Sequence, residues 1–168
     1  TPISSQIGKI SYHVVQYPPY CIDNVQKKMS KQLKEGLKKF NVKEIPIQSL
    51  ATKGWNLQLD TLRRHNRCLC MSQKAWESLC YSAEGIPGFI AWGAYKEEEL
   101  VSFLFTTRID DTGYLLYSAC HHDFLNEHAN KVIYYEVTCH MLNQPGIKSL
   151  FITVQSLDAP ASIDVFKF

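Results

Sequence analysis

One stretch of the chain, residues 88–156, restricts the fold more than any other. It holds three strand-like apolar runs joined by two short polar turns, then an amphipathic segment and a further apolar run. The spacing of the apolar residues predicts a meander, a helix and a last strand. We place the strands at residues 89–95, 100–108, 114–119 and 150–154, and the helix at residues 129–142. This order predicts a mixed, largely antiparallel sheet.

The middle strand of this meander is apolar on both faces. Residues 101–105 read Val-Ser-Phe-Leu-Phe, which puts large apolar side chains on both sides of the sheet. A strand that is buried on both faces needs a covering layer on each side. We therefore predict an α/β fold with a central sheet that is flanked by helices on both faces.

The first forty-odd residues predict a strand, a helix and a second strand. Residues 9–16 alternate as a strand does, and apolar residues then recur at helical spacing as far as Phe40. Asp23 or Asn24 is the expected N-cap of that helix, because a short side-chain oxygen can accept from a free backbone N–H. Residues 42–47 are expected to be extended.

The segment before the meander reads as a loop and two helices. We predict a loop at residues 49–58, a short helix at residues 59–65 and a further helix at residues 73–83, with Ser72 as its cap. The chain has 168 residues, of which 45% are hydrophobic, so we expect one domain that spans residues 1–168.

The charge pattern gives little sign of a nucleic-acid partner. The formal net charge is only +2, whereas nucleic-acid-binding domains are usually strongly basic. Residues 62–67 form a dense basic cluster that either lies on the surface or holds a phosphate or carboxylate. Nucleic acid is an unlikely partner on this evidence.

The six cysteines are expected to be free thiols. The chain is much longer than a small disulfide-stapled scaffold, and it contains no Cys-x-x-Cys pair. No apolar run approaches the roughly 20 residues that span a bilayer. We therefore expect a cytoplasmic location and no membrane partner.

Two segments resemble a known family. Gly93-Ala94-Tyr95, followed by Glu99-Leu100-Val101-Ser102-Phe103-Leu104, is similar to a segment of the GNAT superfamily of N-acetyltransferases, and in particular of its branch that resembles the FemAB peptidyltransferases. The resemblance covers about the last two thirds of the chain. It implies a GNAT-type acyltransferase that moves an acyl group from acetyl-CoA, or another acyl-CoA, to the amine of a small molecule or peptide.

The resemblance also implies where the acyl donor binds. In this family the fourth and fifth core strands splay apart, and backbone N–H groups at the turn after the fourth strand hold the pyrophosphate of coenzyme A. A helix N-terminus suits such an anion. The corresponding residues in this chain are Ser118, Ala119, Cys120, His121, His122, Asn126, Ala129 and Asn130. Gln155 and Ser156 are placed to bind the acceptor or the acyl carbonyl, unless they form the entry to a helix.

The donor turn departs from the family pattern. It contains no glycine, and Asp123 and Glu127 add negative charge where an anion would sit. Two other functions therefore stay open. One is a FemAB-type transferase that takes an aminoacyl-tRNA donor, and the other is a GNAT-like binding module without catalytic activity.

Glu136 and His140 are the candidate catalytic pair. They are four residues apart on the predicted helix and fall within its apolar arc. In such a pair the carboxylate and the imidazole either bond to each other in the core or face a cleft, where they could deprotonate an amine. The family often uses a tyrosine after the fifth strand as the general acid, but Phe166 and Phe168 stand in that region here.

His121, His122 and His128 admit two interpretations. With Asp123 and Glu127 they could hold zinc or iron, or they could form a polar loop that contacts a substrate carboxylate or phosphate. We expect no metal.

The resemblance implies one or two strands beyond Phe168. We therefore expect the domain to lack its C-terminal strands, either because the chain is a fragment or because a partner, such as a second copy in a homodimer, adds a strand at the sheet edge.

Overall fold

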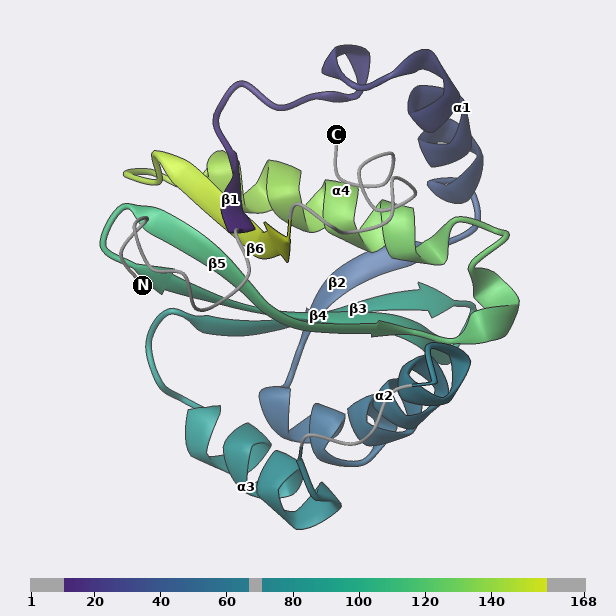
Figure 1. The fold of residues 1–168 in the computed structure, drawn as a ribbon, viewed down its shortest axis with the longest axis vertical. Helices are drawn as coiled ribbons and strands as arrows, with labels where there is room; N and C mark the ends of the chain where they lie inside the picture. Colours follow the sequence, from purple (N-terminus) through teal and green to yellow (C-terminus); the bar gives the residue numbers. More distant parts are fainter. Residues whose placement is uncertain (1–10, 67–70, 157–168) are drawn as a thin grey trace.

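A computed structural model describes residues 11–66 and 71–156, and its central feature is a six-stranded sheet in the order β1-β6-β5-β4-β3-β2. Helix α4 covers one face of the sheet with α1 packed outside it, and α2 and α3 cover the other face (Figure 1). The strands are β1 (Ser11–Gln16), β2 (Asn41–Ile45), β3 (Phe89–Lys96), β4 (Glu99–Ile109), β5 (Thr112–Cys120) and β6 (Ser149–Ser156). The α-helices are α1 (Lys27–Gly36), α2 (Lys53–Arg64), α3 (Gln73–Ala83) and α4 (Ala129–Leu142). The predicted α/β fold with helices on both faces is confirmed.

Strand β4 lies at the centre of two separate hydrophobic cores. Its side chains alternate between them: Val101 and Leu104 pack toward α4, whereas Phe103 and Phe105 pack toward α2 and α3. All four side chains are buried. This two-sided burial is what the apolar run in the sequence predicted.

The core beneath α2 and α3 is centred on Trp76. The indole ring is fully buried and its Nε1–H donates to the backbone carbonyl of Leu50 over 2.8 Å. Its ring also meets Phe103 and Tyr117 at centroid distances of 5.9 and 5.4 Å. These contacts fix α3 against the sheet and against the short 3-10 helix at Ile47–Ala51.

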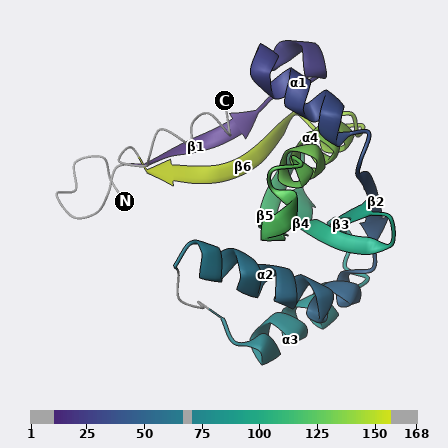
Figure 2. The same cartoon turned by 90° about the vertical axis from the view of Figure 1, so that its right-hand side faces the viewer.

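Strands β5 and β6 run side by side over only a short length. They pair in parallel register at residues 112–114 of β5 and residues 149–151 of β6, although β5 continues to Cys120. Beyond this point β6 turns away from β5, with β1 antiparallel along its outer edge (Figure 2). Among the described residues, positions 115–119 of β5 have no strand partner on that side. We call these five residues the open edge of β5.

Strand β1 pairs with the outer edge of β6, where Val14 lies opposite Thr153, and the two edge strands of the described sheet are β1 and β2. The addition of a strand from a second copy of the chain stays a prediction. No helix in residues 11–66 or 71–156 has the length and apolar character needed to cross a bilayer.

The N-terminal half differs from the predicted elements at two places. The predicted loop at residues 49–58 is wrong: a 3-10 helix is followed by α2, which begins at Lys53. A Cβ at Gly54 would lie only 3.0 Å from the Leu50 side chain, so this glycine lets α2 approach its neighbours closely. The helix expected from Asp23 or Asn24 begins instead at Lys27, with no side-chain cap, and Asn24 Nδ2 donates to the carbonyl of Pro19.

The cap predicted at Ser72 is confirmed, because its side chain accepts a hydrogen bond from the backbone N–H of Ala75. The predicted bounds of α4 are those of the structure. The predicted helix after β6 and residues Phe166 and Phe168 lie outside the described residues.

Two glycines before β3 allow a matched test of how closely the backbone there approaches β4. Gly85 and Gly88 both have positive φ, at 76° and 91°. A Cβ at Gly88 would lie 2.9 Å from the carbonyl oxygen of Arg108, whereas a Cβ at Gly85 would meet nothing within 4 Å. We expect Gly85→Ala to cost about 1 kcal/mol of unfolding free energy, and Gly88→Ala to cost about 1–3 kcal/mol more. Urea denaturation of both variants measures this difference, and equal losses would contradict the close approach of Gly88 to β4.

The four described cysteines are free, as predicted, but they differ in exposure. Cys21 is exposed, whereas Cys80 and Cys120 are buried, and Cys139 is half-buried. Burial raises the pKa of both Cys80 and Cys120 to about 11. Cys68 and Cys70 lie outside the described residues.

This difference predicts the order of thiol alkylation. The reactive species is the thiolate, and a pKa raised by two units lowers its concentration roughly a hundredfold near neutral pH. In native protein, iodoacetamide should modify Cys21 first and leave Cys80 and Cys120 unmodified until urea is added. Mass spectrometry of tryptic peptides gives the order. Equal rates, or a disulfide between any two of these cysteines, would contradict the structure.

Candidate functional site

The candidate site lies where β5 ends and the chain turns into α4. The end of β5 is fixed from the neighbouring helix α2 by Thr61, whose Oγ1 is 3.4 Å from both the backbone nitrogen and the carbonyl oxygen of Cys120. The Cys120 thiol is buried and its Sγ contacts the carbonyl of His121 over 3.5 Å. With its pKa raised by burial, this thiol stays protonated near neutral pH, so Cys120 has a packing role at the end of the strand.

The Ser118 side chain faces α4 and forms a hydrogen bond with it. Its Oγ lies 2.8 Å from the hydroxyl of Tyr134 on α4, and burial raises the pKa of that hydroxyl. Ala119 and Ala129 are also buried, Ala119 in the core beneath α2 and α3 and Ala129 in the core beneath α4. Of the predicted donor-binding residues, these three therefore contribute packing and backbone position.

The turn between β5 and α4 contains a short 3-10 helix, His122–Phe124, before α4 begins. The N-cap of α4 is His128, which has left-handed backbone angles, and no side chain caps the helix. The first turn of α4 thus presents backbone N–H groups around Asn130, and a helix N-terminus favours negative charge. Asn126 is exposed and Asn130 is half-buried.

Glu127 does not add unbalanced negative charge to this turn, contrary to the sequence expectation. Its carboxylate accepts from Lys96 over 2.8 and 3.0 Å and from Lys39 over 3.2 Å. Hydrogen bonds from these two ammonium groups hold the pKa of the Glu127 carboxyl below its usual range. Lys96 also lies over the ring of Phe124, at 5.3 Å from its centroid. The lysines come from β3 and from the turn between α1 and β2, which sequence reasoning had not linked to the turn before α4.

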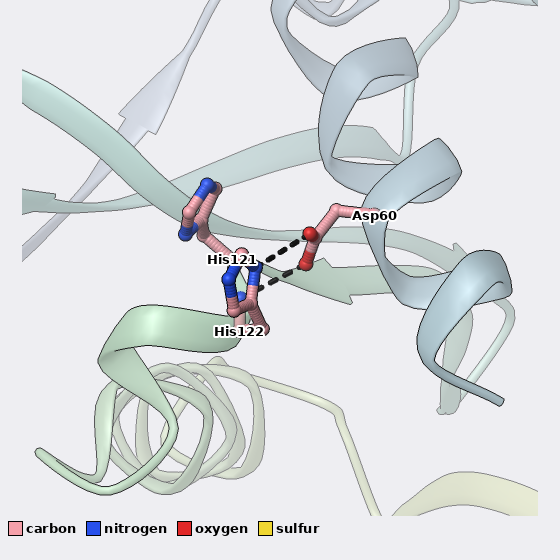
Figure 3. A group of neighbouring side chains, drawn as sticks. All are labelled: Asp60, His121 and His122. Atoms are coloured by element: carbon pink, nitrogen blue, oxygen red, sulfur yellow. Dashed lines mark hydrogen bonds and ion pairs between the residues drawn. The ribbon is translucent and has the colours of Figure 1, made fainter.

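Asp60 connects α2 to the same turn. Its two carboxylate oxygens accept from the backbone N–H of His122 at 2.9 Å and meet His122 Nδ1 at 2.7 Å (Figure 3). His122 Nε2 lies 3.1 Å from the carboxylate of Asp123. The rings of His121 and His122 stack at a centroid distance of 4.6 Å. The structure thus brings together the two predicted histidines and an aspartate that the sequence had not singled out.

A groove of about 620 Å³ lies beside this cluster. It runs between α2, the turn that joins β3 to β4, and His121. Its charged lining is mixed: Lys53, Asp60, Arg63, Glu98 and Glu99. The basic cluster predicted near Arg63 therefore does not form a basic groove in the described residues, and Arg67 lies outside them.

Glu136 and His140 lie away from this region. His140 is exposed, packs against Trp92 of β3 at a centroid distance of 4.6 Å, and approaches Glu44 of β2 at 4.0 Å. Its carboxylate neighbour is thus Glu44 and not Glu136, because β2 and β3 lie under the end of α4. Glu136 is half-buried. The catalytic role of the two residues stays a prediction.

Gln155 and Ser156 lie in β6 opposite Tyr12 and Ser11 of β1. They thus belong to a strand and not to a helix entry. Their side chains lie outside the described part of the structure, so their contact with an acceptor stays a prediction.

Sequence comparisons give no relative: no family model matches the chain, and no curated protein matches it. Solved structures do resemble it. FemX superposes with a TM-score of 0.76 at 9% identity, over 92% of this chain and 57% of the FemX chain. The chain thus spans little more than half the length of FemX.

Two acetyltransferases are also similar in structure. An aminoglycoside acetyltransferase from an uncultured soil metagenomic sample, solved with sisomicin, has a TM-score of 0.58 at 14% identity, over 76% of this chain and 84% of its own. The ribosomal-protein-S18-alanine N-acetyltransferase from Escherichia coli has a TM-score of 0.59 at 12% identity, over 76% and 74%. This chain has the GNAT-like fold that these acetyltransferases and FemX share.

Proposed function

We propose that this chain is an acyltransferase domain that moves an acyl group from acetyl-CoA, or another acyl-CoA thioester, to an amine. The amine nitrogen attacks the thioester carbonyl carbon, the new C–N bond forms and the C–S bond breaks. The amine loses one proton, and the departing thiolate gains one to become the free thiol of coenzyme A. Direct attack in a ternary complex needs donor and acceptor to be held side by side.

The observation that carries this proposal is the open edge of β5. A strand without a neighbour exposes backbone N–H and C=O groups that an extended ligand can pair with. The pantetheine arm of coenzyme A is extended and contains amide groups, so it suits this edge. The edge leads directly to the turn before α4, where the helix N-terminus suits the pyrophosphate.

The charges around the turn also support an anionic donor. Glu127 is paired with Lys39 and Lys96, so its negative charge is balanced at the start of the helix. In this proposal backbone groups of residues 118–130 hold the donor. The groove beside α2 holds the acceptor, and its carboxylates at Asp60, Glu98 and Glu99 attract a protonated amine. The free cysteines fit a cytoplasmic location.

A charge change at the start of α4 tests the donor site. Asn130→Asp keeps the size of the side chain and puts a negative charge in the first turn of the helix. It should stabilise the unliganded protein by about 0.3–1 kcal/mol through the helix dipole. It should also weaken acetyl-CoA binding by at least about fivefold, since like charges near 4 Å cost about 1 kcal/mol even in water. Thermal melting gives the first quantity and calorimetry the second.

The matched control is Asn143→Asp at the C-cap of the same helix. The same charge should slightly destabilise the protein there and leave acetyl-CoA binding unchanged. Equal weakening in both variants would place the donor elsewhere. No binding to the unmodified protein at about 1 mM acetyl-CoA would exclude this donor.

A second candidate is a transferase with an aminoacyl-tRNA donor, as the resemblance to the FemAB branch implies. Helix α1 favours it, because a groove of about 420 Å³ along this helix has four lysines in its lining, Lys27, Lys31, Lys34 and Lys38, against two acidic residues, Asp23 and Glu35. The glycine-free donor turn fits it as well. A gel-shift titration with charged and uncharged tRNA, in the absence of any acetyl-CoA binding, would favour this function. Binding of neither donor would favour a non-catalytic module.

A further inference from the structure

We propose that Asp60, His121 and His122 bind a divalent transition-metal ion of the zinc class. Each residue offers one ligand atom, and these atoms all lie within 4.8 Å of one another. Asp60 comes from α2 and the two histidines from the turn after β5, so the ligands converge from two elements (Figure 3). The site shares Asp60 and His121 with the groove that we propose for the acceptor, but its three ligands are present whichever donor the chain takes.

The hydrogen bonds of His122 show an excess of acceptors. Its Nδ1 lies 2.7 Å from Asp60 and its Nε2 lies 3.1 Å from Asp123. A neutral imidazole has one N–H and can donate to only one of these carboxylates. Within residues 11–66 and 71–156, no lysine or arginine forms an ion pair with Asp60 or Asp123. A bound cation would balance the two carboxylates and take a ring nitrogen as a ligand.

His121 can supply the second nitrogen ligand. Its Nδ1 accepts only a long hydrogen bond of 3.3 Å, from the backbone N–H of Asp123. Because Nδ1 is the acceptor in that bond, it carries a lone pair that a metal ion can use. The ring stacks on His122 with an angle of 25° between the planes, so the two imidazoles already lie beside each other.

The carboxylate ligand is held in place by the fold. Asp60 accepts from the backbone N–H of His122, and the adjacent Thr61 bonds to both backbone groups of Cys120. Trp55 and Leu57 are buried in the core beneath α2 and α3 and anchor the helix on the sheet. A site whose ligands are fixed by neighbouring contacts loses less entropy when the ion binds.

The ligand types and the exposure indicate the class of ion. Two imidazoles and a carboxylate suit zinc and similar transition metals, whereas magnesium and calcium prefer oxygen ligands alone. The side chains of Asp60, His121 and His122 are 21%, 32% and 55% exposed. An ion would thus keep coordination positions open toward the groove, where Asp60 and His121 form part of the wall. There it could accept an oxygen or nitrogen atom of a bound molecule.

The test uses untagged protein that has been treated with a chelator and dialysed. Titration with Zn²⁺ in a calorimeter should show one ion per chain, and the melting temperature should rise with Zn²⁺ because the ion binds the folded state. Co²⁺ should give visible absorption bands of a nitrogen- and oxygen-ligated site. Mg²⁺ at the same concentrations should do neither.

Three variants assign the ligands. His121→Ala, His122→Ala and Asp60→Asn should each weaken Zn²⁺ binding by at least about tenfold. Asp60→Asn keeps an oxygen that can accept from the His122 N–H, so the tether between α2 and the turn survives. His13→Ala, which removes an exposed histidine on β1, is the matched control and should bind Zn²⁺ as the unmodified protein does.

Two results would overturn the proposal. One is the absence of Zn²⁺ binding at about 100 μM, which is well above the concentration that a built zinc site requires. The other is Zn²⁺ binding that His121→Ala and His122→Ala leave unchanged, since the ion would then lie elsewhere on the surface.

Discussion

The structure depends on the burial of β4 on both faces. From Leu100 to Thr107 every residue of this strand is buried, and its side chains contribute to both hydrophobic cores. Removal of either layer of helices would expose one of these cores to water, at a free-energy cost of about 25 cal/mol for each Å² of apolar surface. The positions of α2 and α4 relative to the end of β5 follow from this requirement.

The candidate site is a consequence of that packing. Helix α2 lies against β5 because Trp55 and Leu57 belong to the core beneath α2 and α3. This packing places Asp60 and Thr61 beside the end of the strand. Helix α4 lies against the opposite face, and Ser118 meets Tyr134 there. The turn between β5 and α4 is thus held from both faces of the sheet, by side chains that are far apart in the sequence.

The sequence predicted the elements that depend on local patterns. The meander, the bounds of α4 and the Ser72 cap follow from the alternation of apolar residues and from one side-chain hydrogen bond. The first part of α2 was wrongly predicted as a loop. Trp55, Leu59 and Leu62 recur at helical spacing and were the available signal. The role of Gly54 depends on its contact with Leu50, which only the tertiary structure shows.

The same limit applies to the site. Helical spacing placed Glu136 and His140 near each other, but the neighbour of His140 is set by the strands beneath α4, so it lies beside Trp92 and Glu44. The partners of Glu127 come from β3 and from the turn after α1, and Asp60 comes from a helix some sixty residues before His122. Such contacts join segments whose local sequences carry no sign of one another.

The pairing of β1 with β6 has a consequence for how the protein folds. Val14 meets Thr153, so two segments from opposite ends of the described chain complete one side of the sheet. Contacts between residues so distant in sequence require the closure of a long loop and slow the folding of a domain. During synthesis on the ribosome β1 emerges before β6 and must wait for it. Until β6 has emerged, β1 therefore lacks the strand with which it pairs in the folded structure.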